Sequence, residues 1–96
     1  MEAEPLDPLI HQPTRLRVMA LLVRNREAPF TWVHETLGLT PGNLDSHVSR
    51  LAEAGYVTQW RALTAHGFQS RLAITPGGDQ AYQAYLRALR ALIEVG

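Results

Sequence analysis

The amino-acid sequence predicts a small α+β domain that is mainly α-helical. Two observations predict this fold class. Apolar residues recur at helical spacing through most of the chain, and one stretch in the second half changes to the aromatic and β-branched residues that are typical of strands. A third observation sets the size, since 96 residues with 46% hydrophobic content suffice for one modest core. We therefore expect a single domain over residues 1–96.

The N-terminal helices are expected over residues 6–25. Asp7 followed by Pro8 predicts a short helical turn through His11, and Pro13 begins a second helix. This second helix carries apolar residues around much of its circumference, so it should lie at the centre of the core. Arg24 and Arg26, at the end of this helix, suit the negative end of the helix dipole, so a structural role is sufficient for them. The sequence does not assign a role to Arg15 and Arg17, at its beginning.

A pair of helices joined by a tight turn is expected over residues 30–55. Phe30 is expected to enter the core as a short strand, and Thr31 to cap a helix that ends at Gly38. Trp32, in the first turn of that helix, either covers the rim of the core or touches a phosphate. The connection to the next helix is only a few residues long, which favours two helices at a steep angle.

The second helix of this pair, residues 41–54, has a clear start, two faces and a clear end. Thr40 can cap it, Pro41 suits its first position, and Gly55 can end it in a left-handed conformation. One face is apolar, with Leu44, Val48 and Leu51. A second face carries hydrogen-bonding side chains that can bond to base edges in the major groove: Asn43, Ser46, His47 and Arg50. An ordinary solvated face is the alternative interpretation.

Residues 56–75 change to strand composition, and residues 76–95 return to helical spacing. The first segment predicts a β-hairpin whose loop contains Gly67. The second predicts a long helix with apolar residues three and four apart: Tyr82, Tyr85, Leu86, Leu89, Leu92 and Ile93. A domain this small has little remaining core in which to bury this apolar face. We therefore expect the face to contact a partner, and packing on its own domain is the alternative.

Residues 40–57 resemble the recognition helix and first wing strand of small winged-helix transcriptional regulators related to the MarR and ArsR groups. Residues 6–17 and 72–78 resemble the opening segment and the junction between the wing and the last helix in that family. The resemblance implies a winged helix-turn-helix with a two-stranded wing, a homodimer, and double-stranded DNA as the partner. It implies a dimer interface made by the C-terminal helix and the N-terminal segment, namely Tyr82, Tyr85, Leu86, Leu89, Leu92 and Ile93 with Leu6, Leu9 and Ile10. The expected DNA-binding residues are Thr40, Asn43, Ser46, His47, Arg50, Arg61, His66 and Arg71.

Two features depart from that family. Nine arginines and no lysine balance nine acidic residues to a formal net charge of zero, which predicts modest non-specific DNA affinity. The expected wing tip is apolar, with Phe68 beside Gly67, where relatives carry several basic residues. A winged-helix module that binds another protein, with weak or no DNA binding, is therefore the alternative function.

Other classes of function find little support. The chain has no cysteine, which excludes disulfides and thiolate metal sites, and it has no recognisable catalytic motif. None of its histidines is followed by a second ligand three or four residues further along the chain. We expect no enzyme activity, no metal and no cofactor. The longest apolar run, residues 18–23, is too short to cross a membrane, so we expect a cytoplasmic protein. The sequence does not specify an effector.

Overall fold

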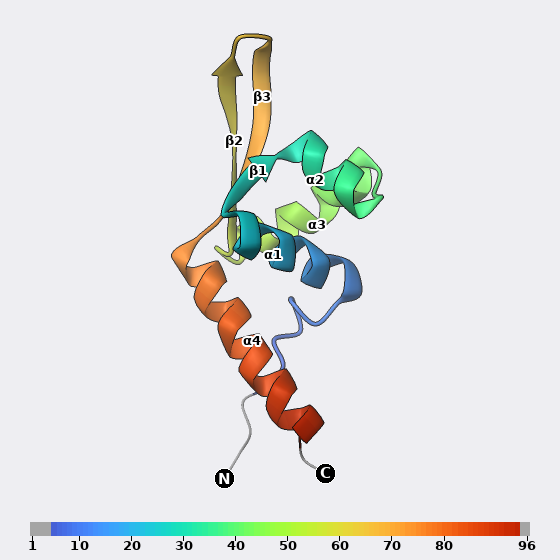
Figure 1. Ribbon diagram of the computed structural model, residues 1–96, viewed down its shortest axis with the longest axis vertical. Coiled ribbons are helices and arrows are strands. Elements are labelled where there is room, and N and C mark those ends of the chain that lie inside the picture. The colour runs from blue at the N-terminus through green and yellow to red at the C-terminus, as the bar shows by residue number, and fades with distance from the viewer. Residues whose placement is uncertain (1–4, 95–96) are drawn as a thin grey trace.

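The computed structural model describes residues 5–94 and confirms the predicted fold class (Figure 1). Its helices pack around the base of an antiparallel sheet with the strand order β1-β3-β2. The described elements are α1 (Pro13–Asn25), β1 (Glu27–Pro29), α2 (Phe30–Leu37), α3 (Pro41–Glu53), β2 (Val57–Thr64), β3 (Gly67–Ile74) and α4 (Pro76–Glu94). The acidic first four residues and the expected end of the last helix at residue 95 lie outside the described residues.

The segment before α1 is a single turn, which confirms the short helical turn predicted from Asp7 to His11. The carboxylate of Asp7 accepts a hydrogen bond from the Leu9 N–H (2.9 Å), and its carbonyl accepts one from the His11 N–H (2.7 Å). The helix does not propagate because Gln12, directly before Pro13, is held in an extended conformation, as residues before proline usually are. Gln12 instead caps α1 by accepting a hydrogen bond from the Arg15 N–H (2.7 Å).

The core lies where α1 crosses α3 and the base of the sheet. The α1 residues Val18, Met19 and Leu22 are fully buried, which confirms α1 as the central helix. The opposing side chains come from α3, β2, β3 and the N-terminal turn. One ion pair joins the end of α1 to the first turn of α4, with Arg26 Nη1 2.9 Å from Asp79 Oδ2. It accounts structurally for one of the arginines at the end of α1.

The boundary between β1 and α2 lies two residues earlier than expected. Phe30 is the first residue of α2 and not a strand residue, and Thr31 lies inside the helix and does not cap it. The N-cap is Pro29, which makes no side-chain cap bond. Proline is tolerated here because β1 is an edge strand, where an N–H group is not required on the open side. Ala28 pairs with Leu72 of β3, and this short strand forms one edge of the sheet.

The hairpin and α4 extend from opposite ends of the core (Figure 1). β2 and β3 pair from Val57 with Ile74 at the base to Thr64 with Gly67 at the tip, and Gly67 has a left-handed φ of 100°. At the base of α4, Thr75 Oγ1 accepts a hydrogen bond from the Gly78 N–H (2.9 Å) and caps the helix. Both elements therefore start in the core and end outside it.

Candidate nucleic-acid interface

The turn between α2 and α3 sets the direction of α3. Gly38 ends α2 with φ 68°, a left-handed conformation that glycine adopts without strain. The Leu39 N–H donates to the carbonyl of His34 (2.8 Å), which closes the turn. Thr40 then begins α3, because its hydroxyl accepts a hydrogen bond from the Asn43 N–H (3.1 Å). The predicted caps of this helix are confirmed at both ends, since Gly55 has φ 81° just after it.

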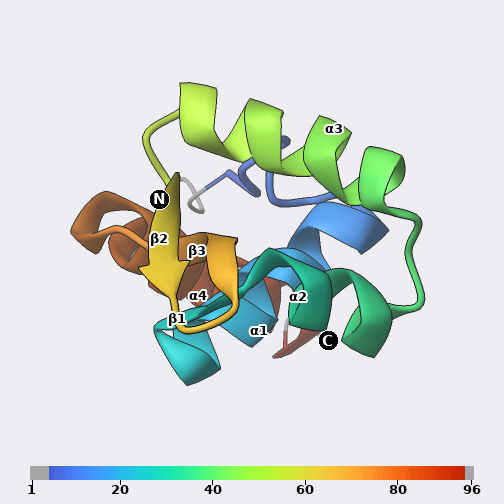
Figure 2. The same ribbon diagram turned by 90° about the horizontal axis from the view of Figure 1, so that it is seen from above.

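The two faces of α3 differ in burial as their sequence spacing predicts. Leu44, Val48 and Leu51 are fully buried and hold the helix on the core. The other predicted face is open, with Asn43, Ser46 and Arg50 exposed and His47 half-buried. Within residues 5–94, the side chains of Asn43, Ser46 and Arg50 form no hydrogen bond or ion pair. Figure 2 shows α3 along one edge of the domain, where this face can approach a large partner.

His47 is the member of this face that contacts the rest of the protein. Its Nδ1 lies 3.4 Å from Nη1 of Arg15 on α1. Burial lowers the pKa of His47, and the positive charges of Arg15 and Arg50 lower it further. A lowered pKa favours the neutral imidazole of His47.

The hairpin brings its predicted DNA-binding residues into different environments. The guanidinium of Arg61 lies 4.9 Å from the ring centre of Phe68, and His66 is exposed in the loop. Arg71 is half-buried and donates to Gln69 Oε1 (2.7 Å), so its guanidinium is partly held by its own strand. The tip is apolar, as expected, with Leu63 73% and Phe68 64% exposed.

Comparison with known proteins identifies the family. The sequence pattern of the family described as winged helix DNA-binding domain matches residues 14–93, which is most of the chain. The chain belongs to this winged-helix family. In this fold α2 and α3 form the helix-turn-helix, and the β2–β3 hairpin is the wing.

Three relatives show how far the likeness of this winged-helix domain extends. A transcriptional regulator homologue from Pyrococcus horikoshii OT3 is 33% identical, with a TM-score of 0.87 over 92% of this chain and 87% of that one. An uncharacterized protein of Methanocaldococcus jannaschii is 28% identical over 81% of this chain and 85% of its own. The oxidized form of MarR from E. coli is 20% identical, with a TM-score of 0.71 over 93% of this chain and 63% of its own, and shows the fold alone.

The residues predicted to form a dimer interface divide into three groups in the winged-helix domain. Ile10 and Tyr85 are buried within the subunit. Their burial has a physical reason, since the turn before α1 packs on α4 and the Tyr85 hydroxyl lies 2.8 Å from His11 Nδ1. The half-buried group is Leu6, Leu9, Tyr82, Leu86 and Leu89. Leu92 and Ile93 are 62% and 72% exposed.

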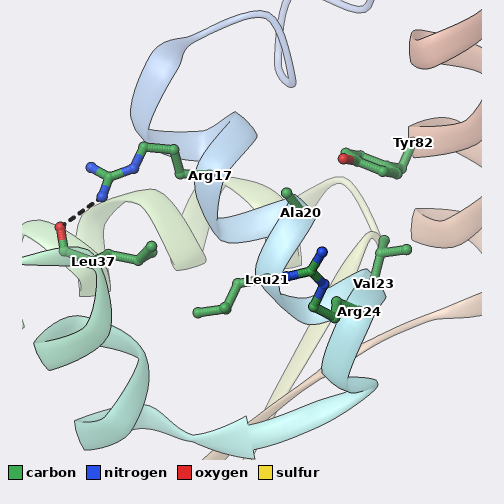
Figure 3. Close-up of a pocket in the computed structure, with 7 residues that line it drawn as sticks. All are labelled: Arg17, Ala20, Leu21, Val23, Arg24, Leu37 and Tyr82. Atoms are coloured by element: carbon green, nitrogen blue, oxygen red, sulfur yellow. Dashed lines mark hydrogen bonds between the residues drawn. The ribbon is translucent and has the colours of Figure 1, made fainter.

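Sequence reasoning missed an open groove beside α1, with a volume of about 460 Å³ (Figure 3). Leu21 and Val23 of α1 and Tyr82 of α4 line it together with Arg17 and Arg24. Arg17 also donates to the carbonyl of Leu37 at the end of α2 (3.1 Å), which accounts for an arginine left open by the sequence. The groove joins residues from three helices, and no local sequence spacing indicates such a site.

Two further findings concern the described part of the winged-helix domain. Residues 5–94 contain no cluster of three histidine or acidic side chains placed to hold a metal ion. None of the described helices is both long enough and apolar enough to cross a membrane.

Proposed function

We propose that this winged-helix protein is a sequence-specific regulator of transcription that binds double-stranded DNA through α3. The observation that carries the proposal is the exposed face of α3, where the side chains of Asn43, Ser46 and Arg50 have no intramolecular hydrogen-bond partner among residues 5–94. A face that served only solubility would not need this combination of amide, hydroxyl, imidazole and guanidinium groups. Membership of a family of DNA-binding domains supports the same conclusion.

The chemistry of this face suits the major groove. An asparagine can bond to both N6 and N7 of adenine, and an arginine can bond to both O6 and N7 of guanine. Asn43 and Arg50 are seven residues apart on α3, about two helical turns, so they can read separate base pairs while Ser46 and His47 lie between them. In this proposal Thr40, at the N-cap, and the exposed Arg61 and His66 of the wing contact the DNA backbone beside the groove.

We further propose that the protein acts as a homodimer through α4 and the N-terminal segment. Leu92 and Ile93 expose apolar surface on the last turn of α4, which association would remove from water. A single domain with a formal net charge of zero would hold DNA weakly, whereas two linked α3 helices bind two half-sites together. Two-fold symmetry then requires an approximately palindromic site whose half-sites are about one helical turn, or a multiple of it, apart.

One observation favours the alternative function, a module for binding another protein. Leu63 and Phe68 form an exposed apolar pair at the wing tip, directly opposite each other in the hairpin register. Large exposed apolar side chains that cluster on a surface are typical of protein-binding sites.

Selection of bound fragments from random duplex DNA with the purified protein tests the proposal. We expect one enriched, roughly palindromic sequence. Arg50→Ala should weaken binding to it by about 1–3 kcal/mol, and Asn43→Ala should relax the preference at one base position. Arg24→Ala, which removes an exposed arginine at the end of α1, is the matched control and should bind as the wild type does.

The DNA proposal fails if no sequence is enriched, or if Arg50→Ala and Asn43→Ala change neither affinity nor the enriched sequence. Failure in that form would leave the protein-binding alternative.

A further inference from the structure

We propose that Arg15 fixes the hydrogen-bonding form of His47, so that His47 presents an Nε2–H donor to DNA and selects a base with an acceptor in the major groove. The inference rests on the proposed DNA-binding function and adds a positioning residue, Arg15, that lies outside α3. It also gives a role to an arginine that the sequence left open.

Arg15 is itself held in place by the segment before α1. Its Nε donates to the carbonyl of Leu9 (2.6 Å), and its backbone N–H donates to the capping oxygen of Gln12 (2.7 Å). Within residues 5–94 it forms no ion pair with a carboxylate. The guanidinium is therefore anchored at one edge while its Nη1 remains available to bond elsewhere.

That remaining group points at His47. Nη1 of Arg15 lies 3.4 Å from His47 Nδ1. A guanidinium has only donors and stays charged at every relevant pH, so a hydrogen bond between the two groups requires Nδ1 to be the acceptor. A neutral imidazole that accepts at Nδ1 carries its proton on Nε2.

The local charges keep the imidazole neutral. Arg15 on α1 and Arg50 on α3 both lie near the ring, so a proton on Nδ1 would create a third positive charge there and would remove the acceptor that Arg15 uses. Burial and these two charges lower the pKa of His47, in agreement with the geometry. The other nitrogen, Nε2, has no hydrogen-bond partner among the described residues.

An Nε2–H donor distinguishes bases by their acceptors. In the major groove, guanine displays N7 and O6, adenine N7 and thymine O4, whereas cytosine displays an amino donor. His47 should therefore favour an acceptor, most readily purine N7, and disfavour cytosine at its base position. A single neutral hydrogen bond of this kind corresponds to a preference of about twofold to tenfold.

The first experiment measures the tautomer of His47 in the DNA-free protein by NMR of the imidazole nitrogens, in the wild type, Arg15→Met and Arg17→Met. We expect the wild type to show the Nε2–H tautomer, and Arg15→Met to show a mixture of tautomers with a raised His47 pKa. Arg17→Met is the matched control, because Arg17 lies on the same helix but bonds to the Leu37 carbonyl. Its His47 should behave as in the wild type.

The second experiment repeats the selection from random duplex DNA with Arg15→Met and His47→Ala. Both variants should lose the preference of about twofold to tenfold at the same base position and keep the preferences set by Asn43 and Arg50.

Either experiment can overturn the inference. A wild-type His47 that is protonated at neutral pH or carries its proton on Nδ1 overturns it without any variant, even if Arg15→Met fails to fold. Loss of preference at different positions in the two DNA variants also overturns it, while leaving DNA binding by α3 intact. If the wild type enriches no sequence at all, the proposed function fails, and the base-reading part of the inference fails with it. The NMR result still decides whether Arg15 sets the tautomer of His47.

Discussion

The carbonyl oxygen of Tyr56 lies so close to Gly78 that a β-carbon on this glycine would be only 2.1 Å away from it. The same carbonyl accepts a hydrogen bond from the Thr75 N–H (3.1 Å), so the start of β2 and the start of α4 are in direct contact. Gly55, which ends α3, lies next to Tyr56, and its carbonyl accepts a hydrogen bond from the Thr75 hydroxyl (2.6 Å). This contact therefore connects α3, the helix proposed to read DNA, with α4, the helix proposed to form the dimer.

Gly78→Ala should destabilise the fold. The added methyl group would meet backbone atoms of Tyr56 that cannot move without displacing β2, and overpacking of this kind costs about 1–3 kcal/mol or more. Gly77→Ala is the matched control, since a methyl group there would have only ordinary contacts, the closest at 3.7 Å. Urea denaturation should show a loss of stability in Gly78→Ala alone. Equal stability of the two variants would show that the contact is not tight.

Tyr56→Phe should destabilise the protein in a pH-dependent way. The hydroxyl of Tyr56 donates to Asp7 Oδ2 (2.5 Å). This hydrogen bond, followed by burial and the charge of Asp7, raises the pKa of Tyr56 to about 12 from an ordinary value of 10.0. A raised pKa means that the folded state holds the proton more tightly than the unfolded state. The stabilisation is therefore fully present below pH 10 and is lost as pH rises through about 12.

Urea denaturation at several pH values checks this prediction. At neutral pH, Tyr56→Phe should lower the free energy of unfolding by about 1–2 kcal/mol. The difference from the wild type should shrink between pH 10 and about 12. Tyr82→Phe serves as the control, because the Tyr82 hydroxyl forms no hydrogen bond with the described residues. A difference that stays constant with pH would mean that the Tyr56 hydroxyl does not bond to Asp7 in solution.

Ile93→Arg should separate the proposed dimer without unfolding the subunit. Ile93 is 72% exposed in the single chain, so the substitution costs little there, whereas an arginine at an apolar interface would be buried without a partner. Half-buried Leu89 is a less clean position, since Leu89→Arg would also disturb the subunit core. Leu63→Arg at the wing tip is the matched control, because Leu63 is 73% exposed. Sedimentation should show a monomer for Ile93→Arg and a dimer for the control and the wild type.

A wild type that sediments as a monomer at micromolar concentration would contradict the dimer. So would an Ile93→Arg variant that remains dimeric.

The affinity for the selected DNA should depend only weakly on salt. Arg50 and Arg61 are exposed and form no ion pair within residues 5–94, which gives about four available arginines per dimer on the proposed DNA-binding surface. Each phosphate neutralised contributes a slope of about −0.9 to the plot of log affinity against log salt, so the total should be no steeper than about −4. Titrations by fluorescence anisotropy at several salt concentrations measure this slope. A slope of about −7 or steeper would show that further arginines contact the phosphates.

Much of this protein was determined by local sequence. Thr40, Pro41 and Gly55 specify where α3 begins and ends, because capping and left-handed conformations depend on the residue itself and its nearest neighbours. The spacing of Leu44, Val48 and Leu51 likewise decided which face of α3 is buried, and so which face is left exposed. Helical periodicity is a local property, and the sequence was sufficient to predict these features.

Tertiary structure alone decided the features that join distant segments. The start of α2 at Phe30 and the burial of Ile10 and Tyr85 depend on what packs against them, and spacing along the chain does not encode that. The contact between Arg15 and His47 spans 32 residues, and the close approach of Gly78 to Tyr56 spans two elements that meet only after folding. Sequence shows what each side chain can do, and the packing of α1, α3 and α4 determines which other side chains it meets.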